Sequence, residues 1–580
     1  MARAITIALL LLPLGVGCRE LKGLGDKPAQ NLVSDWRDEV VYQLLVDRFA
    51  NGDKTNDYNL DRSNMNSYHG GDWQGVIDKL EYLQALGVTT IWISPVVKNV
   101  ESDAGISGYH GYWAQDFTEV NPHFGNVGKL RELSDKVHAR GMKIVLDIVT
   151  NHVGQLFYYD VNKNGQPDIQ IEGSGTESDI TRVTEYDPDY KPAGIRSFTS
   201  LGDAGPAPIV FFDEPQINRV KPMPAALAVP EAYNRRGRVT DWNIDEQVLY
   251  GDFPGGLKDL NTMNPAVQQA MIEVYTHWAE LIDFDGLRID TVKHVEHEFW
   301  RVFCQAVRDH AIARGKKEFV MFGEIFDGND EKVSAYTHDG ELDAVVNFPA
   351  KYQVFEDVIK KNTEPTKKVQ TYWELRAKNY PAFPHENGPS VSPANLPFNF
   401  LDNHDVPRFL SDAPSQAALE QALFMLMAMP GVPVIYYGTE QGYKGENDPS
   451  NREDLWLSHY DQAHPLYVWI KRLAGFRKDL EPLRRGAMVF KWVTERRTGE
   501  DAGILAFART TQGQEVLVVM NTLDAGTSST SFEGAGMPTG FPGKTTLKDL
   551  VTGQTYTTDD NGAVKLSLKA RQNMLLVVAP

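Results

Sequence analysis

The sequence predicts an α/β fold in which a (β/α)8 barrel of parallel strands precedes an antiparallel β-sandwich. Between residues 39 and 437, short apolar runs of strand length alternate with amphipathic segments of helical spacing. Parallel strands joined by helices are buried on both faces, which explains why the runs are almost continuously apolar. Beyond about residue 483 the pattern changes to alternating apolar and polar residues, with turns rich in Gly, Thr, Ser and Asp. That second pattern is typical of an antiparallel sandwich.

Size and charge restrict the classes of protein that the chain can belong to. Its 580 residues are enough for two or three domains. With 42% apolar and 23% charged residues, the chain can build a large core and is not a disordered protein. A formal net charge of -20 argues against nucleic acid and anionic membrane surfaces as partners, whereas a neutral substrate is not repelled. We expect a monomer.

The first 17 residues have the features of an export signal. Arg3 is the charged start, residues 4–16 are apolar, and small Gly17 precedes Cys18. The Gly17–Cys18 junction resembles a bacterial lipoprotein signal, in which Cys18 is lipidated and becomes the mature N-terminus. Gly15 stands where such signals usually have Leu, so simple secretion stays open as the alternative.

We therefore expect residues 1–17 to be removed and residues 18–34 to form a linker. The only other cysteine is Cys304, so lipidation of Cys18 would leave no disulfide. Stability outside the cell would then depend on the core and on bound ions.

The barrel elements follow one another along the chain. In its first half we expect strand 39–51, helix 72–86, strand 87–95, helix 127–140 and strand 142–149. In its second half we expect helix 265–282, a strand within 283–294, helix 299–314 and strands 319–322, 342–348, 398–405 and 432–437, with helix 423–429 before the last. The Pro-rich stretch 380–397 has no assignment.

Charged side chains occur where core strands should be apolar. Leu287 and Ile289 alternate with Arg288 and Asp290, so the charged pair shares one strand face. A neighbouring Arg favours the ionised form of an Asp. A structural ion pair at a strand terminus is the alternative reading of so short a motif. Glu324 also follows a strand, and a barrel presents its active site at strand ends.

Two segments are dense in side-chain oxygens. Residues 51–57 offer Asn51, Asp53, Asn56 and Asp57, a set that suits a hard cation such as Ca²⁺ or forms an ordinary Asn/Asp-rich turn. The second segment lies within about 90 residues after His152 that are rich in Gly, Pro, Asp and Thr, long enough to be functional or a small domain.

Residues 160–168 within that stretch are spaced as in an EF-hand loop. The oxygen donors are Asp160, Asn162, Asn164 and Asp168. The twelfth position is Ile171 rather than Glu, so a solvated turn is the alternative to a calcium loop.

Four segments, taken in order, resemble the signature regions of the alpha-amylase family of glycoside hydrolases: 146–152, 283–294, 322–324 and 400–405. The resemblance extends from about residue 35 to the C-terminus and is closest to calcium-dependent fungal-type and bacterial alpha-amylases. It implies a barrel in two parts, 35–151 and 241–482, an inserted B domain at 152–240 and a C domain at 483–580. We expect none of the additional modules of cyclodextrin glucanotransferases and neopullulanases.

The resemblance implies a retaining mechanism. Asp290 is expected to be the nucleophile, Glu324 the general acid and then base, and Asp405 the third carboxylate, which binds sugar hydroxyls and favours a distorted ring. In retaining enzymes the two reacting carboxylates are about 5 to 5.5 Å apart. The substrate-binding residues that it implies are His110, Tyr112, His152, Arg288, Lys293, His404, Asp448 and Arg452.

The resemblance also implies calcium. The central ion of the family corresponds to Asn151, Asp259 and the backbone carbonyl of His294. The loop with Asn51 resembles the calcium loop of cyclodextrin-forming members, completed by Gly70 and Asp72. A zinc site would need His and Cys side chains, and neither cysteine lies near these motifs.

We therefore expect an exported alpha-amylase that hydrolyses internal α-1,4 bonds of starch-like glucans, anchored by Cys18 or secreted. A transglycosylating or cyclodextrin-degrading relative is the first alternative, because the same three carboxylates serve both. A non-catalytic glucan-binding surface lipoprotein is a more remote one. Fold alone does not decide among them.

Overall fold

The structure is a computed structural model of the chain. It describes residues 27–103, 105–160, 163–165, 169–172, 182–185, 205–253, 255–412 and 414–579. The expected signal, Cys18, Asn162 and Asp168 lie outside these residues. Within the described ranges, no helix combines the length and the apolar character that crossing a membrane requires.

Eight parallel strands form the predicted barrel. They are β1 (Val41–Leu44), β2 (Thr90–Ile93), β7 (Lys143–Ile148), β14 (Gly286–Ile289), β15 (Val320–Gly323), β16 (Ala344–Val345), β17 (Phe398–Phe400) and β18 (Val432–Tyr436). Strand β1 pairs in parallel with both β2 and β18. A parallel bridge between Val346 and Phe398 joins β16 to β17, which completes the ring. The prediction of a barrel is confirmed.

Helices follow the strands along the chain and cover the barrel. They include α4 (Val127–His138), α6 (Pro265–Ile282), α7 (His297–Ala313), α8 (Asp330–Ala335), α10 (Lys367–Asn379), α11 (Gln416–Ala428) and α12 (Pro465–Asp479). The bounds of α6 agree with the predicted 265–282. Asn264 accepts a hydrogen bond from the Ala266 N–H and Pro265 occupies the first turn, so local chemistry sets where this helix begins.

Three elements differ from the prediction. The chain makes a helical turn, α1 (Val46–Phe49), where the first strand was expected to continue. The helix predicted at 72–86 is divided at Lys79 into α2 (Trp73–Asp78) and α3 (Leu80–Leu86). The sixth strand is only two residues long, because the chain then enters α9 (Phe348–Ala350) and a π-helix, η9 (Lys351–Lys360).

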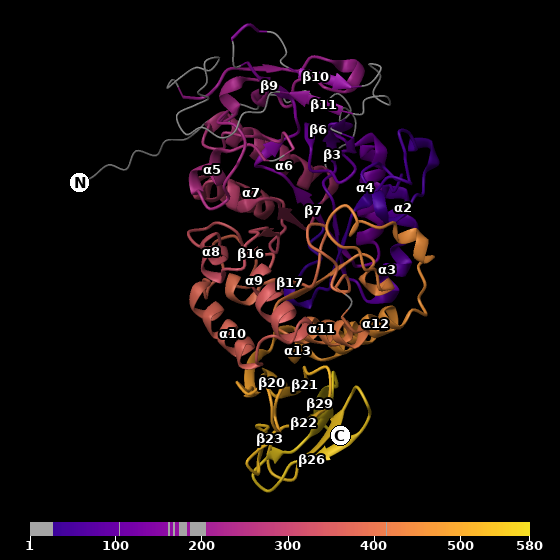
Figure 1. The fold of residues 1–580 in the computed structure, drawn as a ribbon, viewed down its shortest axis with the longest axis vertical. Coiled ribbons are helices and arrows are strands. Elements are labelled where there is room, and N and C mark those ends of the chain that lie inside the picture. The colour runs from indigo at the N-terminus through magenta and orange to yellow at the C-terminus, as the bar shows by residue number, and fades with distance from the viewer. Residues whose placement is uncertain are drawn as a thin grey trace, which may run out of the picture.

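The insertion after β7 returns to the barrel through short antiparallel pairs. Strand β8 (His152–Val153) pairs with β13 (Lys258–Asp259), and β9 (Phe157–Tyr159) pairs with β12 (Ile209–Phe211). The insertion also contains the hairpin of β10 (Ile169–Glu172) and β11 (Arg182–Glu185) and the short helix α5 (Asp245–Tyr250). Figure 1 shows β9, β10 and β11 at one end of the molecule and the C-terminal strands at the other.

The C-terminal region is an antiparallel sheet, as the alternating pattern predicted. Its strands, in spatial order, are β19 (Ala487–Trp492), β20 (Ile504–Thr511), β21 (Gln514–Asn521), β29 (Asn573–Val578), β25 (Thr546–Asp549) and β26 (Thr555–Thr557). A separate apolar cluster, which includes Leu517, Val519 and Leu576, forms the core of this region.

Aromatic and branched side chains fill the barrel interior. Phe322 and Phe398 stack with ring centroids 3.8 Å apart. Trp36, fully buried, lies against Phe398 and donates its indole N–H to the carbonyl of Glu318, just before β15 begins. Val33 belongs to the same cluster. The N-terminal segment therefore closes the end of the barrel at which the strands begin.

Candidate active site

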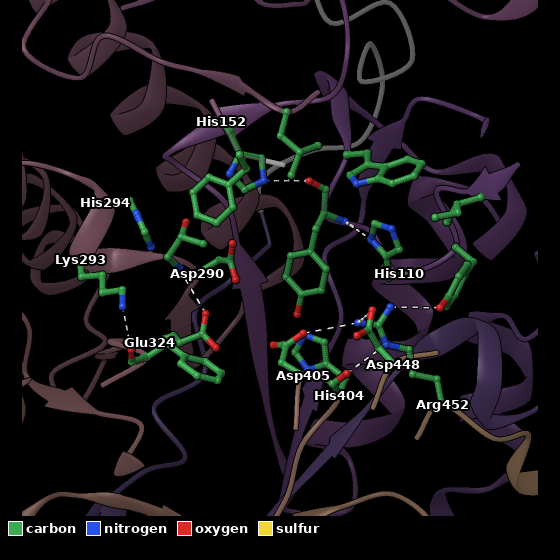
Figure 2. Close-up of a pocket in the computed structure, with 18 of the residues that line it drawn as sticks. His110, His152, Asp290, Lys293, His294, Glu324, His404, Asp405, Asp448 and Arg452 are labelled. Carbon is green, nitrogen blue, oxygen red and sulfur yellow. Dashed lines mark hydrogen bonds and ion pairs between the residues drawn. The ribbon is translucent and has the colours of Figure 1, made fainter. Parts of the chain in front are cut away.

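A cavity of about 580 Å³ lies where the barrel strands end (Figure 2). Ten of the residues predicted to act at the active site line it: Asp290, Glu324, Asp405, His110, Tyr112, His152, Lys293, His404, Asp448 and Arg452. Lys293 and His294 lie at one end, and Asp448 and Arg452 lie at the other, with Asp290 between them (Figure 2).

Arg288 is buried beneath this cavity and contacts three carboxylates. Its Nη1 atom lies 2.8 Å from Asp147 Oδ1 and 2.9 Å from Asp290 Oδ1, and its Nη2 atom lies 2.8 Å from Glu324 Oε2. The strand register explains this arrangement, because Arg288 is aligned with Asp147 of β7 and with Phe322 of β15, two residues before Glu324. One guanidinium thus holds Asp290 and Glu324 side by side.

Burial raises the pKa of Asp290 well above its ordinary value. The negative charges of Glu324, Asp147 and Asp405 act in the same direction, and Arg288 opposes them. Arg288 thus lowers the pKa of Asp290, the direction in which the predicted pairing acts, but burial has the larger effect. The same guanidinium also serves Asp147 and Glu324.

The sequence analysis did not single out Asp147. Besides Arg288, its carboxylate accepts hydrogen bonds from Trp92 Nε1 at 2.9 Å and from the Tyr112 hydroxyl at 2.8 Å. Burial raises its pKa to about 6, although Arg288 lowers it. The sequence feature that could have identified Asp147 is a carboxylate within the otherwise apolar run of β7.

Asp405 is held by a His and an Arg. Its carboxylate lies 3.0 Å from His404 Nε2 and 3.4 Å from Arg452 Nη2. Gln43 Nε2 lies 2.9 Å from the other ring nitrogen of His404. Burial lowers the pKa of His404, and the charges of Arg452 and Arg288 lower it further, so the imidazole is neutral at neutral pH.

Stacked rings form one wall of the cavity. Tyr112 and His404 are almost parallel, at 3° and 5.1 Å between centroids. His110 accepts a hydrogen bond at Nδ1 from the Tyr112 N–H, and its ring is stacked with Tyr112 at 5.8 Å. His152 Nε2 lies 3.1 Å from the Tyr112 carbonyl, and burial lowers the His152 pKa to about 4.

The end opposite Arg452 contains aromatic side chains that the sequence analysis missed. Phe253 lies 4.6 Å from the His294 ring and 5.5 Å from Trp242, between ring centroids. Trp242 is 48% exposed, and Lys293 donates to the carbonyl of Phe326. Trp242 and Phe253 belong to the irregular insertion, where no periodic pattern marks them.

A sequence profile described as the catalytic domain of alpha amylase matches residues 43–485. The chain belongs to the alpha-amylase family of glycoside hydrolases. An alpha-amylase from Streptomyces lividans is 33% identical over 563 residues, which cover 90% of this chain and 57% of that protein. This chain thus spans little more than half the length of that relative.

Solved structures of the alpha-amylase family have the same fold. An Anoxybacillus alpha-amylase is 26% identical with a TM-score of 0.72, covering 94% of this chain and 99% of its own. CldA, a cyclomaltodextrin glucanotransferase with a three-domain ABC distribution, is 25% identical with a TM-score of 0.71. The match covers 93% of this chain and 99% of CldA. Solved structures that this chain covers almost completely thus include both an amylase and a glucanotransferase.

Alpha-amylases generally bind calcium, and the residues around Asn151 fit such an ion. Asn151 Oδ1 is buried without a hydrogen-bond partner. Asp259 is buried next to Asn151, because the N–H of the following residue, Leu260, donates to the Asn151 carbonyl. The Asp259 carboxylate accepts a hydrogen bond from Asn234 Nδ2 at 2.7 Å. Burial and the charges of Asp252 and Glu296 raise the Asp259 pKa well above its ordinary value. A hard cation would relieve this accumulation of negative charge.

The third predicted calcium ligand is the carbonyl of His294, whose side chain is engaged elsewhere: its ring Nδ1 lies 3.0 Å from the carbonyl of Val248. In the described part of the chain, no three His, Cys, Asp or Glu side chains gather into a metal-binding group. Any ion here would rely on amide and main-chain oxygens, as calcium commonly does.

The N-terminal loop brings together three of its six predicted ligands, Asn51, Asp57 and Gly70. Asn51 Nδ2 donates to Asp57 Oδ1 at 2.7 Å, and a Cβ on Gly70 would lie 2.6 Å from that same oxygen. Asn51 Oδ1 and Asn56 Oδ1 are buried without partners. These orphaned oxygens fit a calcium ion.

Two of the other predicted ligands in the N-terminal loop have other partners. Asp72 accepts from the N–H groups of Gly52, Asp53 and Gly75, which makes it the cap of α2. Asp53 accepts from Thr55 N–H. In the insertion, Asp160 is buried and accepts from the N–H groups of Asn164 and Gly165, at 3.0 and 3.1 Å.

Proposed function

We propose that the protein is a retaining hydrolase of α-1,4-linked glucans. The observation that carries this proposal is the guanidinium of Arg288, bonded to Asp290 and Glu324 at the floor of a cavity whose opposite wall holds Asp405. Two neighbouring carboxylates are what a double-displacement reaction at a sugar carbon requires.

In this mechanism Asp290 attacks the anomeric carbon and forms a covalent glycosyl-enzyme. Glu324 protonates the departing glycosidic oxygen and later takes a proton from the incoming water. Asp405 and the neutral His404 bind sugar hydroxyls, and these bonds strengthen as the ring distorts towards the transition state. Tyr112 offers its ring to the sugar face, with its hydroxyl held by Asp147.

We further propose that calcium binds Asn151, Asp259 and the carbonyl of His294, where it ties the insertion at 152–240 to the barrel. A second ion would bind Asn51, Asn56, Asp57 and Gly70. The orphaned oxygens and the uncompensated carboxylate of Asp259 support both sites. The N-terminal sequence supports export, with Cys18 as the candidate lipid anchor.

One alternative has specific support. The likeness to CldA and the resemblance of the Asn51 loop sequence to the calcium loop of cyclodextrin-forming members favour a transglycosylating or cyclodextrin-degrading enzyme. A chromatographic time course of the products separates the two activities. The substrates are soluble starch, maltoheptaose and β-cyclodextrin, and each is incubated once with calcium and once after calcium has been removed by a chelator.

An endo-amylase releases a spread of intermediate oligosaccharides from starch, loses activity on chelation and opens cyclodextrin slowly. Fast opening of cyclodextrin, or products longer than maltoheptaose, would instead support the alternative. Absence of any new product from all three substrates would refute the proposed function.

A further inference from the structure

A second cavity, of about 340 Å³, lies outside the active site. We call it the loop cavity. It is lined by Ala50, Asn51, Lys54, Arg62, Gly75, Asp78, Lys79, Trp456 and Tyr460. Its size is within the range of ~300–1,000 Å³ typical of small-ligand pockets. Apart from Asn51, which is a proposed calcium ligand, none of these side chains has a role in the proposed function.

Two segments of the chain contribute residues to both the loop cavity and the active-site cavity. The segment with Arg62 also contains Asn66, which lines the active-site cavity. The segment with Trp456 begins with Asp448 and Arg452 at the end of that cavity opposite Lys293 (Figure 2). In each segment the two sets of lining residues are four positions apart: Arg62 and Asn66 in one, Arg452 and Trp456 in the other.

The two aromatic rings in the loop cavity have different surroundings. Tyr460 is held in place, since its hydroxyl donates to the Phe49 carbonyl at 2.8 Å and Lys79 Nζ lies 4.0 Å from its ring centroid. Trp456 is only partly buried, and the nearest cation, Arg62, lies 5.7 Å from its ring. Within the described residues its indole N–H has no hydrogen-bond partner. Trp456 thus offers an apolar surface and a free donor to a ligand.

The charges of the loop cavity are close to balanced. Its three cations, Lys54, Arg62 and Lys79, are accompanied by Asp78 in the lining and by Asp57, 3.8 Å from Arg62. Arg62 is also held by the carbonyl of His69 at 2.7 Å. Such a site has donors, acceptors and an aromatic surface but little excess charge. These features fit a neutral, hydroxyl-rich ligand better than an anion.

We propose that the loop cavity is a second glucan-binding site, which holds a distant part of a long substrate while another part occupies the active site. This inference rests on the proposed function, because it takes the same substrate class. Trp456 supplies the stacking surface, and Lys54 and Asp78 supply polar contacts to sugar hydroxyls.

The test compares Trp456→Ala with Leu457→Ala, a control at a neighbouring side chain that is 68% exposed and does not line the cavity. Retardation by amylose in native gels measures binding, and the ratio of activity on amylose to activity on maltotriose measures its consequence. We expect Trp456→Ala to weaken retardation and to lower the ratio by ~5- to 10-fold, as the loss of one aromatic contact implies. Leu457→Ala should change neither.

Equal retardation of the two variants, at unchanged melting temperatures, would overturn the proposal. So would abolition of retardation by 10 mM inorganic phosphate together with a phosphate-dependent rise in melting temperature, since that result assigns the cavity to anions. Failure of the proposed function has another signature, because the native protein would then cleave neither amylose nor maltotriose while its retardation could still be measured.

Discussion

Asp147 and Arg288 lie opposite each other on neighbouring strands of the barrel, and 2.8 Å separates their carboxylate oxygen and guanidinium nitrogen. Both side chains are buried. Asp147 also fixes the Tyr112 hydroxyl, so one carboxylate orients both the cation beneath Asp290 and the ring beside the proposed sugar site. It acts through these neighbours and is a positioning residue.

We expect Asp147→Asn to lower kcat/KM on maltoheptaose by ~10- to 100-fold, because Arg288 loses one of its three charged partners. Breaking a buried ion pair costs about 3 to 5 kcal/mol when an uncompensated charge remains, but Asp290 and Glu324 still neutralise Arg288, so we expect a smaller loss of stability. Kinetics and thermal unfolding on the same preparation check both points. An unchanged pH profile of kcat/KM would argue that Asp147 has only a structural role.

Asp290→Asn should lower kcat by ~10⁴-fold or more, since it removes the nucleophile. The substitution is nearly isosteric, so binding of amylose in native gels should persist. NMR of the first products of the native enzyme should show the α-anomer, as retention requires. Retained turnover in Asp290→Asn would refute the assigned mechanism. The same variant tests the non-catalytic alternative, which predicts no turnover by the native protein either.

Trp242→Ala should reduce transfer to sugar acceptors relative to hydrolysis. Trp242 is exposed beside Phe253 at the end of the cavity opposite Arg452, where it can present an aromatic face to an incoming sugar. We expect the ratio of transfer to hydrolysis to fall ~3- to 10-fold when products from maltoheptaose are resolved by chromatography. Val229→Ala, at a similarly exposed side chain that does not line the cavity, is the matched control.

Calcium should raise the melting temperature of the native protein, because an ion that binds only the folded state contributes about 2.7 kcal/mol at a hundredfold excess over its dissociation constant. Asp259→Asn should lose most of this response. In a chelator, the same variant should be at least as stable as the native protein, since it removes a buried carboxylate that no cation accompanies. A full calcium response in Asp259→Asn would exclude the central site.

The contribution of two buried histidines to stability should be lost as the pH falls below about 6.5. Burial lowers the pKa of His110 and of His404, with nearby arginines acting in the same direction, so both imidazoles are neutral in the folded protein. In the unfolded chain they bind protons as the pH falls below the ordinary value of about 6.5. Their contribution is therefore complete above that pH and is lost below it. His110→Asn keeps an acceptor for the Tyr112 N–H and should unfold with a weaker pH dependence between pH 7.5 and 5.

The parts of the fold that could be predicted are those with a local physical signature. The apolar runs of β7 and β15 mark buried strands, and Asn264 with Pro265 marks the start of α6. The division of the helix at Lys79 and the π-helix after β16 have no such signature, because packing against neighbouring elements decides them.

The same distinction applies to the active site. Asp290 and Glu324 are conspicuous as charged residues at the ends of apolar strands, and the family resemblance assigned roles to them and to Asp405. Trp242 and Phe253 were missed because an aromatic residue in an irregular segment has the same sequence pattern whether it lines a cavity or fills a core. The sharing of Arg288 among three carboxylates depends on the register of β7, β14 and β15, which no single segment encodes.

The buried indole of Trp36 marks the end of the barrel that lies opposite the active site. The segment that begins at Lys27 is fixed at the end of the barrel where strands start, with Lys27 Nζ hydrogen-bonded to Ser134 Oγ and to the carbonyl of Ile282. The stretch from Cys18 to Lys27, with eight residues between them, spans at most ~30 Å. If Cys18 is attached to a surface, the opening of the cleft points outward, so that polymer can approach from the medium without passing between the enzyme and its support.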